Sequence, residues 1–128
     1  MSRTAEDVET FLLQLRRPFE LEGGTYLVST SSAAGPTIAL RIVPPLVAIR
    51  MTIGPAPAGN QADLFRKLLE FNATDLLHVA YGIDQELIVL SAALELENLD
   101  ANELDAALSD MDLAYSRHTS VLRQLAKA

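Results

Sequence analysis

Two apolar segments joined by a pair of prolines constrain the fold more than any other part of the chain. The segments TIALRIV (37–43) and LVAIRMTI (46–53) flank Pro44–Pro45 and contain the β-branched residues that favour strands. Symmetric pairing about the prolines gives one wholly apolar face, on which the opposed residues are Ile38 and Met51, Leu40 and Ile49, and Ile42 and Val47. We therefore predict an antiparallel hairpin with one buried face.

A second hairpin is predicted further along the chain. The segments LLHVAYGI (76–83) and ELIVLSAALEL (86–96) flank Asp84–Gln85, where we place the turn. The same pairing test produces an apolar face, on which the opposed residues are Tyr81 and Ile88, Val79 and Leu90, and Leu77 and Ala92. On the opposite face, it brings His78 beside Ser91.

Three helices complete the expected architecture. One begins at the capping-box residue Thr4 and stops at Pro18, a second follows the cap residue Asn60, and a third begins at Asp100. A further strand is expected at TYLVST (25–30), before a loop over 31–36. We predict a single α+β domain over residues 1–128, ordered α-β-β-β-α-β-β-α. Its mostly antiparallel five-stranded sheet would carry the helices on one face.

Composition excludes several classes of function. The 128 residues carry a net charge of −7, which disfavours nucleic acid as the main partner because phosphate binding needs a basic surface. The chain has no cysteine, so disulfides, thiolate catalysis and cysteine-ligated zinc are excluded. No apolar run approaches the roughly 20 residues that span a bilayer. We expect a cytoplasmic protein.

Catalytic and metal-binding patterns are weak. The two histidines, His78 and His118, have no neighbours at metal-ligand spacing. A nucleophilic pair of Ser91 with His78 is one interpretation, and an ordinary polar cross-strand pair is the other. His118 falls within the apolar stripe of the last helix, either as a packed, hydrogen-bonded residue or at an interface. We predict no catalytic residue, cofactor or metal. The alternative is a small-molecule sensor or regulatory domain, or a hydrolase centred on His78.

The second face of the predicted sheet is a candidate interaction surface, because it is more apolar than a solvated face needs to be. Its candidate contact residues are Arg41, Val43, Leu46, Arg50, Leu87 and Val89. The stripe of the last helix adds Met111, Tyr115 and His118, which we place in the core first and at an interface second. The alternative is that a loop or the N-terminal segment covers this face.

Four short motifs, in order, resemble the YbjN-type domains of the type III secretion chaperone-like (Tir chaperone) family. They are the helix end LLEFN (68–72), the turn GID (82–84), the alternating strand LIVLSAALEL (87–96) and the helix start LDANEL (99–104). The resemblance implies a small cytoplasmic bacterial homodimer that binds an extended segment of another protein without catalysis or cofactor. It implies no particular partner or secretion system.

Overall fold

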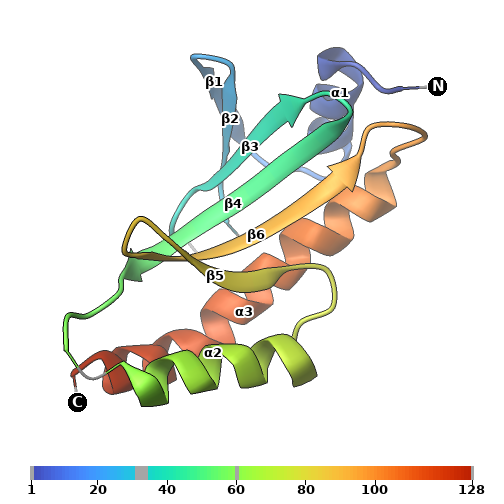
Figure 1. Cartoon of the computed structure of the whole chain (residues 1–128). Helices are drawn as coiled ribbons and strands as arrows, with labels where there is room; N and C mark the ends of the chain where they lie inside the picture. The colour runs from blue at the N-terminus through green and yellow to red at the C-terminus, as the bar shows by residue number, and fades with distance from the viewer. Residues whose placement is uncertain (1, 31–34, 60, 128) are drawn as a thin grey trace.

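The computed structural model describes residues 2–30, 35–59 and 61–127 and places three helices on one side of a single antiparallel sheet (Figure 1). The sheet order is β1-β2-β3-β4-β6-β5. The elements are α1 (Ala5–Gln14), β1 (Phe19–Glu22), β2 (Thr25–Val28), β3 (Ile38–Val43), β4 (Leu46–Pro55), α2 (Ala62–Thr74), β5 (Ala80–Asp84), β6 (Leu87–Glu95) and α3 (Ala101–Lys127). The predicted α+β class, with helices on one face of an antiparallel sheet, is confirmed. Residues 31–34 of the expected loop and the expected cap Asn60 lie outside the described residues.

The sheet has six strands, so the prediction of five was wrong by one. The additional strand, β1, pairs with β2 across a turn at Gly23 and Gly24, both of which have positive φ angles. Its sequence FELE is only four residues long, and three of these residues are exposed. A short edge strand buries too little surface to give a clear apolar pattern, which is why the sequence did not identify it.

The first hairpin has the predicted register. Ile38 lies opposite Met51, Leu40 opposite Ile49 and Ile42 opposite Val47, and the turn consists of the two prolines, joined by a cis peptide. Burial alternates along β4, with Val47, Ile49 and Met51 directed into the core. A one-residue slip would have moved this apolar set into water, so the sequence specified the pairing strongly.

The second hairpin is shifted by two residues from the predicted register. Tyr81 lies opposite Leu90, and Ile83 lies opposite Ile88. The turn is formed by Gln85 and Glu86, whose φ angles are 50° and 67°, rather than by Asp84–Gln85. A two-residue turn with both φ angles positive matches the twist of a hairpin. Because the shift is even, the residues of β5 and β6 keep their predicted faces. The placement of Leu77 on the apolar face was wrong, since Leu77 precedes β5 and is 86% exposed.

The core lies between the sheet and the three helices. Val8 and Leu12 of α1, Leu64 and Leu68 of α2, and Leu104, Leu108, Met111 and Leu122 of α3 pack against the inner residues of the sheet. All of these side chains are at most 5% exposed. Burial of this apolar surface is the main force holding the helices on the sheet.

His118 is a polar side chain buried in this core and is 3% exposed. Its ring stacks on Phe71 with the centroids 3.6 Å apart, its Nδ1 lies 2.8 Å from the Tyr81 hydroxyl, and its Nε2 lies 2.9 Å from Oδ2 of Asp75. His118 thus takes the packed, hydrogen-bonded position of the two alternatives, and it joins α3 to β5 and to the end of α2. The hydrogen bond from His118, together with one from Thr74, lowers the pKa of Asp75, whereas burial raises the pKa of Tyr81.

His118→Ala should lower the free energy of unfolding by about 2–4 kcal/mol, because it removes the ring stacked on Phe71 and leaves the Tyr81 hydroxyl unpaired. Urea denaturation at neutral pH measures this change. Ser120→Ala, an exposed position on the same helix, is the control and should change stability by less than about 0.5 kcal/mol. A similarly small effect at His118 would contradict its structural role.

Asp75 should make stability depend on pH. Since the folded protein lowers the pKa of this carboxyl below its ordinary value of 3.8, the ionised form favours the folded state. The contribution is complete above the ordinary value and is lost as the pH falls through the lowered pKa. Asp75→Asn should therefore destabilise the protein at pH 5–7, and this effect should diminish as the pH falls below 3.8 and through the lowered pKa, as measured by urea denaturation. In a His118→Gln background, the same substitution should show less pH dependence; an unchanged dependence would contradict the assignment to His118.

Candidate interaction surface

The sheet face directed away from the helices is uncovered by any other described element, and we call it the outer face (Figure 1). Strand alternation places Arg41, Val43, Leu46, Arg50 and Leu87 there, as predicted. Val43 is 51% exposed, Leu46 39% and Leu87 40%. Because Val8 and Leu12 of α1 are buried in the core, the N-terminal helix does not cover this face.

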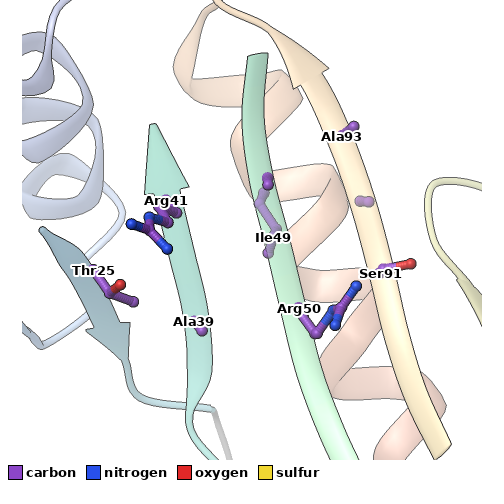
Figure 2. A pocket seen from close by; sticks show the side chains of 9 residues that line it. Thr25, Ala39, Arg41, Ile49, Arg50, Ser91 and Ala93 are labelled. Atoms are coloured by element: carbon purple, nitrogen blue, oxygen red, sulfur yellow. The ribbon is translucent and has the colours of Figure 1, made fainter. Parts of the chain in front are cut away.

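A shallow hollow of about 630 Å³ crosses the middle of the outer face. It forms because small side chains occupy neighbouring positions on the central strands. We call it the outer trough; Thr25, Ala39, Arg41, Ala48, Arg50, Ser91 and Ala93 line it (Figure 2). Figure 2 shows the Arg41 side chain extending toward Thr25 and the Arg50 side chain toward Ser91, so the two guanidinium groups diverge.

Arg50 forms an ion pair that spans β6. Its guanidinium lies 2.5 Å from Oδ2 of Asp84 on β5, although the two residues belong to strands on either side of β6. Arg50 lies opposite Ser91 of β6, and Asp84 lies opposite Leu87 of β6. Val89 is the residue of β6 between these two positions on the same face, so the ion pair passes over it. Val89 was predicted as an exposed contact, and this was wrong, since it is only 4% exposed beneath the pair.

The predicted stripe of the last helix contributes little accessible surface. Met111 is fully buried, and His118 is buried in the core, where it contacts Phe71, Tyr81 and Asp75. Tyr115 is half-buried and borders a cavity of about 260 Å³ between the end of β4 and the last turns of α3, together with Ile53 and Leu122. Of the three residues, Tyr115 is the one that retains surface for a contact.

The predicted pairing of His78 with Ser91 was wrong. Ala80 lies opposite Ser91, whereas His78 precedes β5, has an exposed side chain and donates its backbone N–H to Oδ2 of Asp110 at 2.9 Å. The two-residue shift of the hairpin separates the side chains, and a nucleophile needs a base within hydrogen-bond reach. Within residues 2–30, 35–59 and 61–127, no group of three acidic or histidine side chains could hold a metal ion.

The sequence did not predict an apolar groove between α2 and β5. Its volume is about 240 Å³, and we call it the α2–β5 groove; it is lined by Phe65, Leu68, Leu69, Asn72, Tyr81, Gly82 and Ile83. Leu69 is 68% exposed and Ile83 45%. The sequence of α2 contained one signal of this groove. Besides the buried leucines Leu64 and Leu68, the helix has a further leucine, Leu69, that the core does not bury.

The Asn72 side chain closes part of the β5 edge. Its amide nitrogen donates to the Tyr81 carbonyl at 3.2 Å, and its amide oxygen accepts from the Tyr81 N–H at 2.7 Å. The amide therefore occupies the place of a neighbouring peptide group. Because these edge groups are already paired, a strand added at β5 would have to displace Asn72.

Among the described helices, none is long and apolar enough to cross a membrane. Comparison with curated proteins found no match.

Solved structures share the fold at low sequence identity. A chain of the heterodimeric ExoU-SpcU complex from the type III secretion system of Pseudomonas aeruginosa is 20% identical, with a TM-score of 0.73, and the match covers 91% of this chain and 98% of that one. YbjN of E. coli, a putative transcription regulator, is 11% identical, with a TM-score of 0.73 and 93% of both chains covered. A chain from the Yersinia pestis secretion chaperone SycH bound to a YscM2 fragment is 19% identical, with a TM-score of 0.60 and coverage of 88% and 97%.

A family model agrees with the resemblance that the four sequence motifs indicated. The model described as CesT_Tir_1 matches residues 1–128. The protein therefore belongs to the CesT_Tir_1 family of type III secretion chaperone-like proteins.

Proposed function

We propose that this protein is a non-enzymatic, chaperone-like homodimer that holds an extended segment of another protein on its outer face. The observation that carries the proposal is the uncovered outer face, on which Val43 and Leu46 are exposed at one end, Leu87 is exposed at the other, and the outer trough lies between them. Exposed apolar side chains gathered on one face are typical of protein-binding surfaces.

The structural relatives support the same class of function by analogy. One belongs to a heterodimeric complex of the type III secretion system, and another is a secretion chaperone in complex with a stable fragment of a second protein. A shared fold alone does not transfer a function, so the proposal depends on the surface of this chain.

The sheet edges favour binding across the outer face rather than strand addition. At one edge, β1 carries Glu20 and Glu22, and charged residues on an edge strand discourage pairing. At the other edge, Asn72 occupies the backbone groups of Tyr81. An extended segment would therefore contact the outer face mainly through side chains.

The α2–β5 groove is our proposed homodimer contact. Leu69 and Ile83 are exposed beside an apolar groove that the outer face does not use. A second copy presents the same exposed leucine, so a twofold axis along the groove would let each Leu69 cover the apolar lining of the other copy. Dimerisation at this position leaves the outer face of each copy open.

Leu69→Asp should convert a dimer into a monomer, because it would place a carboxylate in the apolar contact. Light scattering coupled to size-exclusion chromatography should give a mass near twice 13.9 kDa for the unmodified protein and near 13.9 kDa for the variant. Leu13→Asp is the matched control, since Leu13 on α1 is also 68% exposed, and it should remain a dimer. A monomeric unmodified protein would overturn the homodimer, and a dimeric Leu69→Asp would place the contact elsewhere.

Leu46→Asp should weaken segment binding, because a charge would replace an apolar contact beside the outer trough. Panning the purified protein against a displayed library of random twelve-residue peptides should select binders, whose affinities fluorescence anisotropy then measures. The variant should bind these at least about tenfold more weakly while melting at a similar temperature. Leu113→Asp, at a 47% exposed position on α3, is the control and should bind normally. If no selected peptide depends on Leu46, the outer face is not the binding surface.

A further inference from the structure

Arg41 and Arg50 are the only basic residues in the six strands, and both lie on the outer face at the trough. Arg50 already has a carboxylate partner, since it is paired with Asp84. Arg41 forms no ion pair or hydrogen bond with any side chain in the described part of the chain. Before any partner binds, the Arg50 guanidinium is thus paired with a carboxylate, whereas the Arg41 guanidinium has no such partner in the described part of the chain.

The acidic residues of the outer face lie at its margins. Strand pairing places Glu20 and Glu22 on the edge strand β1 and Glu95 at the far end of β6, while Asp84 is bound to Arg50. Glu22 is level with Arg41 but separated from it by Thr25 of β2. None of these carboxylates neutralises the Arg41 guanidinium.

A segment covering the outer trough would remove Arg41 from water. Burying a charged group without a partner is costly, and removing the solvent also strengthens any ion pair that replaces it. In the same row of the sheet, Arg41 has Thr25 on one side, toward which its side chain extends, and the small residues Ala48 and Ala93 on the other (Figure 2). A carboxylate pairs with a guanidinium through two parallel hydrogen bonds, which makes it the most favourable partner for this position.

We propose that the segment bound on the outer face carries an acidic side chain, which pairs with Arg41 in the outer trough. This inference rests on the proposed function and adds the chemistry of the partner. It runs against the net charge of −7, whose field attracts basic ligands and repels acidic ones. An acidic preference would therefore be a property of the trough and not of the whole molecule.

The peptides selected from the random twelve-residue library provide the test. Binders that depend on Leu46 should share an aspartate or glutamate among apolar residues. Replacing that acid by its amide should weaken binding to the unmodified protein about tenfold, the loss expected for one charge-assisted pair. The same replacement should change binding to Arg41→Gln by less than about twofold. Arg66→Gln on α2 removes an equal charge from an 80% exposed side chain off the sheet, and it should behave like the unmodified protein.

Each contrary result has a distinct meaning. Leu46-dependent binders without an acid, or an equal amide effect on Arg41→Gln, would overturn the acidic partner and leave the proposed function standing. Failure to select any Leu46-dependent peptide would overturn both. Saturable binding of inorganic phosphate alone at millimolar concentration, lost in Arg41→Gln, would assign the trough to a small free anion and overturn the acidic segment.

Discussion

Packing of three helices against a single face of the sheet gives the central strands two different environments. On β4, Val47, Ile49 and Met51 are sealed beneath the helices, while the alternate residues Leu46, Ala48 and Arg50 face outward. The inner set fixes the register of the hairpin, because any odd slip would expose it. The same alternation places Leu46, Ala48 and Arg50 together on the outer face of the sheet. The outer face, our candidate interaction surface, is therefore a geometric consequence of how the core is built.

This coupling explains which parts of the fold could be predicted. The β3–β4 register followed from apolar pairing alone, since opposing faces differ sharply in polarity. The β5–β6 register did not, because shifts by two residues keep every side chain on its face, and the turn then decides between them. Turns with positive φ angles usually contain Gly, Asn or Asp, so Gln85 and Glu86 did not indicate one. Strand β1 escaped prediction because its four residues bury little surface.

The candidate surface was predictable at the level of faces and not at the level of side-chain contacts. Alternation placed Arg41 and Leu46 correctly, yet Val89 is buried on the same face, in the row between Arg50 and Asp84, which form an ion pair from two strands that are not adjacent in the sheet. Knowing that pair requires the sheet order, in which β6 lies between β4 and β5. The α2–β5 groove likewise requires the position of α2 against the sheet edge. The periodicity of apolar residues along the sequence predicts neither the sheet order nor the position of α2.

Closure of the β5 edge by Asn72 has a consequence for how the two proposed contacts relate. An open edge would invite pairing of strands between copies, and that contact would extend the sheet and compete with any segment lying across it. With the Tyr81 groups paired to Asn72, strand addition at this point of the edge is disfavoured, and the contact that we propose between copies uses side chains such as Leu69 and Ile83. The proposed hydrophobic contact between copies and the proposed binding surface at the outer trough can then be occupied together. If both proposals hold, the Asn72 amide of α2 keeps self-association apart from the binding of a partner segment.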